Sequence, residues 1–279
     1  MGSSDIGACS FSAFLDYQGN GVSTMILAIV NNKGGTAKSA TAVNLAAALA
    51  LKGRRTLLID LDSQASASLS LGIDRADFKP SIADAIMDSR GMSGIIRKTG
   101  AEGLDLITGS PDLADADLQL ARIPGRERRL KDAIAPIRPG YDFIILDCPP
   151  SLGLLAVNSM VAADAFIIPT PPEYLALEGL VGLLDAVQRI HEGIGDTCRL
   201  LGILLTKVDH RRKVTEEIIR VIRRHYGDQV FKTEIRVDVR LIEAPSFGKT
   251  IFQYDRRSAG AEGYLQLADE IIRRKGRMP

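Results

Sequence analysis

The stretch Asn31-Asn32-Lys33-Gly34-Gly35-Thr36-Ala37-Lys38-Ser39 decides the fold. It lies between an apolar run at 25–30, predicted as a buried strand, and an Ala- and Leu-rich run at 39–51, predicted as a helix. Small residues let successive backbone N–H groups turn inward around phosphate oxygens, and the helix N-terminus adds its positive dipole end. Lys38 can then reach the β- and γ-phosphates, while the Ser39 hydroxyl can ligate Mg²⁺. These features predict a phosphate-binding loop.

The loop departs from the common pattern GxxxxGK[ST], because Asn32 and Ala37 stand at its two glycine positions. Ala37 brings a Cβ into the loop, which is easy only where φ is negative. The alternative interpretation of the whole stretch is a glycine-rich strand-to-helix turn that carries an exposed lysine.

Further apolar runs alternate with helix-like stretches along the rest of the chain. The predicted strands lie at 56–60, 104–107, 143–146, 165–169 and 200–205. The predicted helices lie at 81–87, 126–137, 175–191, 214–226 and 261–274. This alternation implies an α/β fold, a mostly parallel sheet with helices on both faces. We expect a single domain at residues 25–279, preceded by a flexible N-terminal extension at residues 1–24.

The composition is that of a globular protein, since 25% of the 279 residues are charged and 46% are hydrophobic. No apolar stretch approaches the ~18 residues of a membrane span. The three cysteines lie far apart, so we expect a protein of the reducing cytoplasm. The net charge is +1, but residues 199–279 hold 18 Lys and Arg against 11 Asp and Glu. This asymmetry can mark either a polyanion partner or a solvated surface.

Four ordered motifs resemble those of the ParA/MinD family of partition and positioning ATPases. The loop, with Lys33 before two glycines, is similar to the family's deviant Walker A motif, KGGxxK[ST]. Residues 57–64, LLIDLDSQ, are similar to a second motif that usually reads DLDPQ, and residues 143–152, FIILDCPPSL, to the Walker B motif. Residues 241–255 resemble the C-terminal signature of ParA proteins in particular. The resemblance implies a P-loop NTPase fold of the short ParA form, without an N-terminal helix-turn-helix.

The same resemblance implies an ATPase with ATP and Mg²⁺ as cofactors. Lys33 would reach across a dimer interface to the partner's phosphates, and Lys38 and Asp62 would complete the catalytic set, Asp62 by orienting the attacking water. The implied metal site consists of Ser39, Asp60 and Asp147. The implied nucleotide contacts are Lys33, Gly34, Gly35, Thr36, Ala37, Lys38, Ser39, Ala40, Pro245 and Phe247. The family also places adenine-side contacts near residues 206–211.

Structural alternatives exist for several of these residues. Asp147 could be a structural residue at a strand end, Asp60 could cap the next helix, and Phe247 could pack in the core. Ala40 and Ser63 depart from the usual Thr and Pro of the family, and Ala65, like Ala37, stands where a glycine is usual. These departures concern the hydrolysis rate more than nucleotide binding.

By resemblance, the chain is an ATP-dependent homodimer that binds double-stranded DNA without sequence preference. It would segregate or position a chromosome, plasmid or protein cargo on the nucleoid in the cytoplasm, and a ParB-like or cargo adaptor protein would stimulate hydrolysis. Arg240 is the first choice for a DNA contact. The other candidates are Arg236, Arg220, Arg223 and Arg224. Alternatively, these arginines pair with Glu216, Glu217, Asp228 and Asp238 on a solvated surface.

Two rival functions remain open. A MinD-like membrane-associated ATPase would end in an amphipathic helix whose apolar face enters the bilayer. Here the apolar positions of 265–272 are spaced like a face that packs on the domain, so we expect no membrane partner. A metabolic P-loop enzyme would need a substrate pocket or cluster-ligating cysteines, and the sequence shows neither pattern.

Overall fold

The sheet of this protein has eight strands in the order β3-β4-β2-β5-β1-β6-β7-β8, and every neighbouring pair is parallel except β3 with β4. The computed structural model describes residues 24–88, 91–195 and 197–276, so the predicted N-terminal extension lies, apart from Thr24, outside the described residues. The strands are β1 Met25–Ile29, β2 Thr56–Asp60, β3 Arg97–Lys98, β4 Leu104–Ile107, β5 Phe143–Asp147, β6 Ala165–Thr170, β7 Arg199–Val208 and β8 Val230–Arg236.

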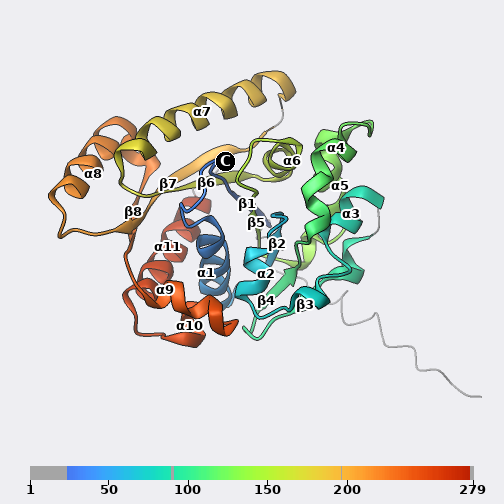
Figure 1. The fold of residues 1–279 in the computed structure, drawn as a ribbon, viewed down its shortest axis with the longest axis horizontal. Coiled ribbons are helices and arrows are strands. Elements are labelled where there is room, and N and C mark those ends of the chain that lie inside the picture. Colours follow the sequence, from blue (N-terminus) through green and yellow to red (C-terminus); the bar gives the residue numbers. More distant parts are fainter. Residues whose placement is uncertain (1–23, 89–90, 196, 277–279) are drawn as a thin grey trace, which may run out of the picture.

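Helices cover both faces of the sheet (Figure 1). One hydrophobic cluster joins the sheet to α1 Lys38–Leu51, α10 Ile251–Tyr254 and α11 Ala259–Lys275. A second cluster joins the opposite face to α3 Ile82–Asp88, α4 Ala116–Leu120, α5 Arg129–Ile134, α6 Leu154–Ala162 and α7 Tyr174–Ile194. The remaining helices are α2 Ser66–Ser70, α8 Lys213–Tyr226 and α9 Arg240–Glu243. The predicted α/β class, with a mostly parallel sheet between two helical layers, is confirmed.

All six predicted strands exist, but two substantial elements were missed. Strand β8 reads VFKTEIR, with alternating buried and exposed residues, because it lies at the sheet edge and only half of it is covered. Helix α6 is apolar nearly all round and lacks a helical period in its sequence. The predicted helix at 126–137 is shorter than expected, because a 3₁₀ turn over Arg126–Arg128 precedes α5.

The last helix packs against the domain as predicted. In α11 the side chains of Leu267, Ala268 and Ile271 are fully buried, and Leu265 and Ile272 pack beside them. Among the described residues, no helix has both the length and the apolar character needed to span a bilayer.

The strand order gathers three functional loops at one edge of the sheet. Strand β5 lies between β1 and β2, and the register sets Asp60, the last residue of β2, beside Asp147, the last residue of β5. The chain turns to opposite sides of β1, which makes the carboxyl edge of β1 and β5 the switch point where ligands bind in open α/β sheets. The phosphate-binding loop follows β1 at this edge.

Candidate nucleotide-binding site

The phosphate-binding loop is held in place by its own side chains. Asn31 donates from Nδ2 to the carbonyl of Pro169 at 2.7 Å and accepts the backbone N–H of Lys33 on Oδ1 at 2.9 Å. Lys38 is buried, and its Nζ donates to the carbonyl of Lys33 at 3.2 Å. Burial lowers the pKa of Lys38, although the carboxylates of Asp147 and Asp62 act in the opposite direction. The loop therefore surrounds a buried cationic group, as an anion site requires.

Ala37 does not have the negative φ that would accommodate its Cβ easily. Ala37 has φ 69° and ψ 32°, in the left-handed region, and it is the N-cap of α1. Ala65 has φ 52° and ψ 40° and is the N-cap of α2. An L-residue in this region brings its Cβ close to the following carbonyl. Both alanines therefore adopt a backbone conformation that glycine reaches at lower cost.

The end of β7 contacts the loop directly. Thr206 donates from Oγ1 to the carbonyl of Thr36 at 3.1 Å, and Lys207 donates from Nζ to the carbonyl of Gly35 at 2.6 Å. The resemblance places this segment on the adenine side, whereas here its first two residues contact the loop backbone. The sequence holds no local signal for these contacts, because the partners are 170 and 172 residues apart.

The two acids at the ends of β2 and β5 are fully buried, but their surroundings differ. Asp60 accepts hydrogen bonds on Oδ2 from the backbone N–H and hydroxyl of Ser68, at 2.8 and 2.7 Å, and on Oδ1 from the N–H of Asp62 at 3.2 Å. It thus satisfies an N–H in the first turn of α2, the capping role given as its alternative. Burial raises the pKa of Asp60 to about 6.

Neither carboxylate oxygen of Asp147 has a hydrogen-bond partner among the described residues. Burial, and after it the neighbouring charge of Asp60, raises the pKa of Asp147 well above its usual range, while nearby Ser39 and Lys38 act in the opposite direction. A buried carboxylate without a partner is costly, and binding to a cation removes that cost. Carboxylate and hydroxyl oxygens are ligands that Mg²⁺ prefers. Asp147, with Ser39 beside it, therefore fits a magnesium site.

Asp62 borders a cavity of about 250 Å³ at the same edge of the sheet. The cavity is also lined by Ser63, Gln64, Pro150 and Ser151, so it joins the motif after β2 to the loop after β5. Asp117 of α4 also faces this cavity and accepts the N–H of Leu155, near the start of α6, at 3.0 Å. Asp117 could not be singled out from the sequence, because α4 is short and the partner of Asp117 lies 38 residues away.

Lys33 lies against α7 of its own protomer. A β-carbon at Gly179 would come within 2.8 Å of Lys33 Cε and 3.1 Å of Lys33 Nζ. The lysine that the resemblance sends across a dimer interface is therefore close-packed on a helix beside the site. Residues Gly34 and Gly35 are exposed, so the outer side of the loop is open.

Phe247 does not pack in the core, contrary to the alternative considered for it. Its side chain is 62% exposed and stacks on Tyr254, with ring centroids 5.3 Å apart. Pro245 is half-buried in the 3₁₀ turn Ala244–Phe247, which packs against α2. An exposed aromatic ring close to the helix that Asp60 caps is available to stack on a planar group.

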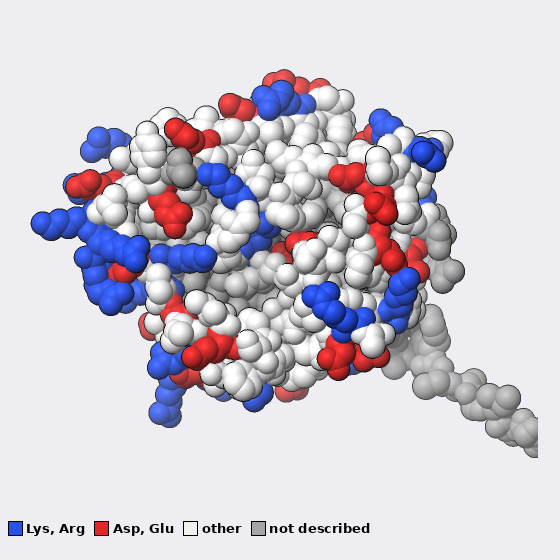
Figure 2. Space-filling model, in the orientation of Figure 1, with Lys and Arg blue, Asp and Glu red and all other residues white. Residues whose placement is uncertain are grey.

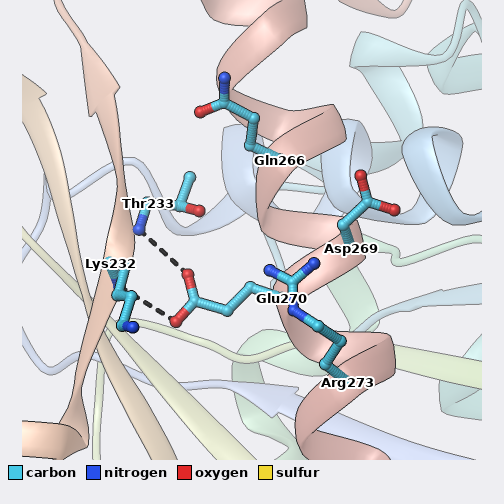
Figure 3. Close-up of a pocket in the computed structure, with 6 residues that line it drawn as sticks. All are labelled: Lys232, Thr233, Gln266, Asp269, Glu270 and Arg273. Carbon is cyan, nitrogen blue, oxygen red and sulfur yellow. Dashed lines mark hydrogen bonds between the residues drawn. The ribbon is translucent and has the colours of Figure 1, made fainter.

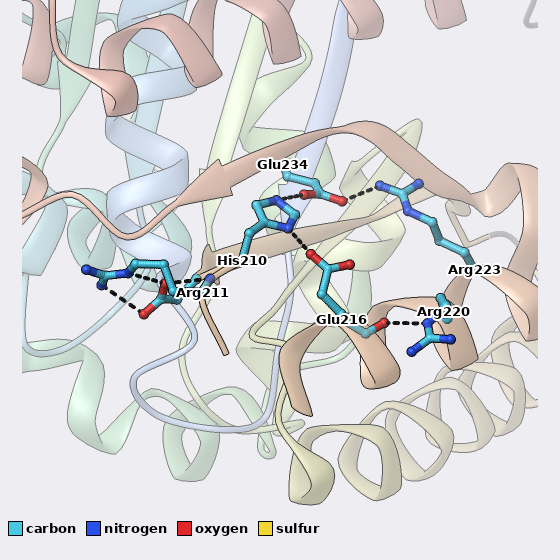
Figure 4. Close-up of polar contacts among 7 residues, drawn as sticks. His210, Arg211, Glu216, Arg220, Arg223 and Glu234 are labelled. Atoms are coloured by element: carbon cyan, nitrogen blue, oxygen red, sulfur yellow. Dashed lines mark hydrogen bonds and ion pairs between the residues drawn. The ribbon is translucent and has the colours of Figure 1, made fainter. Parts of the chain in front are cut away.

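The candidate DNA-contacting arginines divide into two groups. Arg223 pairs with Glu234 at 2.7 Å, and Arg220 donates to the backbone carbonyl of Glu216 at 3.3 Å (Figure 4). Arg240 pairs with Asp255 at 2.7 Å. The side chains of Arg224 and Arg236 are exposed and form no ion pair or hydrogen bond within the described part of the chain. In Figure 2, Lys and Arg side chains gather on the side where α8 and β8 lie in Figure 1.

His210 links the elements under these arginines. Its ring contacts Glu216 of α8 through Nδ1 and Glu234 of β8 through Nε2, the latter at 2.9 Å (Figure 4). The hydrogen bond with Glu216 raises the pKa of His210.

A cavity of about 320 Å³ lies between β8 and α11, away from the phosphate-binding loop (Figure 3). Glu270 accepts the backbone N–H groups of Lys232 and Thr233 at 3.0 Å each and the guanidinium of Arg274 at 3.0 Å. These hydrogen bonds already occupy both carboxylate oxygens of Glu270. The cavity is therefore explained by the way α11 packs against β8.

Comparison with known proteins shows which proteins this chain resembles. Residues 24–199 match the model of an AAA domain family. The chain is 44% identical over 246 residues to the sporulation initiation inhibitor protein Soj of Bacillus subtilis, covering 88% of this chain and 97% of that one. It is 41% identical over 249 residues to the chromosome partitioning protein ParA of Myxococcus xanthus, covering 89% and 88%.

A solved structure of cobyrinic acid a,c-diamide synthase from Mycobacterium smegmatis with bound ADP and magnesium superimposes with a TM-score of 0.78. It is 32% identical and covers 90% of this chain and 94% of its own. Its name belongs to the metabolic class of the second rival function, but its identity to this chain is lower than that of the partition proteins. By its motifs, its site and these relatives, the chain belongs to the ParA-type family of partition ATPases.

Proposed function

We propose that this protein binds and hydrolyses ATP with Mg²⁺, forms a nucleotide-dependent homodimer, and segregates or positions a chromosome, plasmid or protein cargo. The observation that carries the proposal is that the phosphate loop holds a buried Lys38, while the neighbouring strand end holds a buried Asp147 whose carboxylate has no hydrogen-bond partner among the described residues. The Lys38 ammonium is suited to bind the phosphates, and the Asp147 carboxylate is suited to bind the magnesium ion that accompanies them. ADP with magnesium in a structurally similar protein supports the same pair of ligands.

The proposal assigns a role to each residue of the site. The loop N–H groups and Lys38 bind the phosphates, Ser39 and Asp147 hold the magnesium, and Asp62 orients the attacking water across the cavity it lines. When bound, the metal neutralises charge on the β- and γ-oxygens. Asp60 supports this arrangement from behind, because its hydrogen bonds fix α2 and the backbone of Asp62.

Lys33 acts between protomers. Two nucleotides that face one another across an interface repel, and a lysine ammonium between them offsets part of that repulsion. In the single protomer the Lys33 side chain packs against Gly179 of α7. Helix α7 therefore borders the surface from which Lys33 would extend toward the partner. Pro245 and Phe247 contact the adenine side, where the exposed Phe247 ring is available for stacking.

DNA binding uses the basic surface of α8, β8 and α9. Arg220, Arg224 and Arg236 are exposed, and none of them pairs with a carboxylate within the described part of the chain. Arg240 and Arg223 border the same surface, although each shares its charge with an acid. A dimer presents this surface twice, so DNA affinity depends on ATP, ignores sequence and falls steeply with salt.

The partner would be a ParB-like or cargo adaptor protein that stimulates hydrolysis, and the site of action would be the nucleoid in the cytoplasm. The membrane alternative is disfavoured because the apolar residues of α11 are buried in the core. An apolar face that is already packed has no free surface for a bilayer.

The test is binding of long duplex DNA with Mg-ATP at about 50 mM salt, where phosphate contacts are strong. The wild type should bind, and Arg240→Glu and Arg236→Glu should each abolish binding while leaving ATP binding intact. Arg122→Glu, an exposed arginine near the end of α4, is the matched control and should bind normally. If the wild type binds vesicles of anionic lipid with ATP but not DNA, the membrane function replaces this one.

A further inference from the structure

Strand β7 carries a β-bulge at the point where it meets the phosphate loop. The register pairs Leu205 with Glu234 and Val208 with Arg236, so three steps along β7 match two steps along β8. Lys207 lies within the bulge at φ 53°, in the left-handed region. Bulges next to active sites re-aim a side chain, and a lysine enters this region rarely.

The bulge delivers two neighbouring side chains to the same target. Thr206 is fully buried and donates to the carbonyl of Thr36, while Lys207 extends over the surface and donates to the carbonyl of Gly35. In a regular strand these two side chains would point to opposite faces of the sheet. The left-handed conformation of Lys207 directs both side chains to the phosphate-binding loop.

These contacts orient the donors that a nucleotide needs. The carbonyl of Gly35 shares a planar trans peptide with the N–H of Thr36, and the carbonyl of Thr36 shares one with the N–H of Ala37, so each N–H points away from its carbonyl. Within the described part of the chain, neither N–H donates a hydrogen bond. Anchoring the two carbonyls to β7 therefore turns two unpaired donors to the opposite side of the loop.

We propose that Lys207 is a positioning residue that compensates for Ala37. Glycine at position 37 would reach the left-handed conformation without cost, but alanine must be held there. Lys207 and Thr206 stabilise this conformation through their hydrogen bonds to the carbonyls of Gly35 and Thr36, which are two residues and one residue before Ala37. An ammonium on the Gly35 carbonyl also polarises the peptide and strengthens the Thr36 N–H as a donor.

This inference rests on the proposed function, since it concerns how the same loop binds a triphosphate. The experiment compares Lys207→Met and Lys207→Arg in the wild-type protein and in an Ala37→Gly background. The readouts are the Kd for Mg-ATP and the Kd for inorganic triphosphate with Mg²⁺. Lys213→Met, which removes another exposed lysine at the start of α8, is the matched control.

Lys207→Met should weaken binding of both ligands about tenfold, as expected for the loss of one charge-assisted hydrogen bond. Lys207→Arg should recover most of that loss, and Lys213→Met should change neither Kd. In the Ala37→Gly background the loss should shrink to about threefold or less, because glycine keeps the loop conformation without the contact.

Three results would overturn the proposal. An equal loss in both backgrounds would show that Lys207 does not compensate for Ala37. A loss for ATP but not for inorganic triphosphate would show that Lys207 contacts the base instead. An equal loss in Lys213→Met would reduce the effect to general charge. Failure of the wild-type protein to bind Mg-ATP would refute the proposed function itself, which separates the two failures.

Discussion

Lys33 of the phosphate loop and Gly179 of α7 are so close that no β-carbon fits between them without displacing the lysine. The nearest atoms, Lys33 Cε and Nζ, would lie 2.8 and 3.1 Å from such a carbon. A single protomer therefore already gives Lys33 a defined position, and in the proposed dimer Lys33 would leave that position to contact the partner's nucleotide. Substitutions at the two residues separate the lysine's charge from its position.

Lys33→Ala should retain ATP binding through Lys38 but lose ATP-dependent dimerisation and hydrolysis, because the ammonium between the two nucleotides is gone. Gly179→Ala, which only displaces the lysine within its own protomer, should keep both activities. Light scattering with Mg-ATP and phosphate release measure the two effects. Normal dimerisation and hydrolysis by Lys33→Ala would remove the residue from the mechanism.

Ala37→Gly and Ala65→Gly should each stabilise the nucleotide-free protein by about 0.5–1 kcal/mol. Removing the strain of a left-handed alanine raises the free energy of unfolding by about 1–2 kcal/mol. The greater conformational freedom of glycine in the unfolded chain offsets part of this gain. Urea unfolding measures the change. Ala50→Gly, in the last turn of α1, is the control and should instead destabilise by about 1 kcal/mol or more.

Asp147→Asn should raise the stability of the nucleotide-free protein by about 1–2 kcal/mol, because burial and the neighbouring Asp60 oppose ionisation of this carboxyl group, whose oxygens have no hydrogen-bond partner among the described residues. The same change should abolish the stabilisation that Mg-ATP gives the wild type. Thermal unfolding with and without Mg-ATP tests both halves. Asp112→Asn, in an exposed pair with Lys79, is the control and should alter neither. A destabilised Asp147→Asn protein would show that the residue is a structural strand-end group.

Asp62→Ala should trap the ATP-bound dimer, because the phosphate and metal ligands remain while the water-orienting carboxylate is lost. Hydrolysis should fall about 10²–10⁴-fold. Gel filtration with ATP and phosphate release over the same period report the two properties. Hydrolysis at the wild-type rate would exclude Asp62 as the water-positioning group.

His210 should contribute stability that depends on pH in a defined direction. The hydrogen bond with Glu216, and the charge of Glu234, raise its pKa in the folded protein above the unfolded value. A raised histidine pKa stabilises the fold fully below the unfolded pKa, and the contribution disappears as the pH rises through the folded pKa. The melting temperature of wild type should exceed that of His210→Gln near pH 6 and converge with it at alkaline pH. A difference that grows with pH would contradict this assignment.

Prediction from the sequence succeeded where a feature is local. The strand, loop and helix around Lys38 follow from consecutive residues, and so do the acids that end β2 and β5, because apolar runs and small residues carry that information themselves. The φ of Ala37 could not be predicted, because contacts from Thr206 and Lys207 lie far along the chain. Strand β8 was missed for a related reason: only its place at the sheet edge explains its half-polar pattern.

The distance along the chain between the loop and its anchors has a consequence for synthesis on the ribosome. The loop emerges early, but Thr206 and Lys207 follow about 170 residues later, and α11, which packs on α1, is later still. At translation rates of 5–20 residues per second this interval is about 10–30 s. During this interval the phosphate-binding loop has been synthesised, but its hydrogen bonds to Thr206 and Lys207 cannot yet form. The chain therefore acquires its ATP site as one of the last events of its own translation.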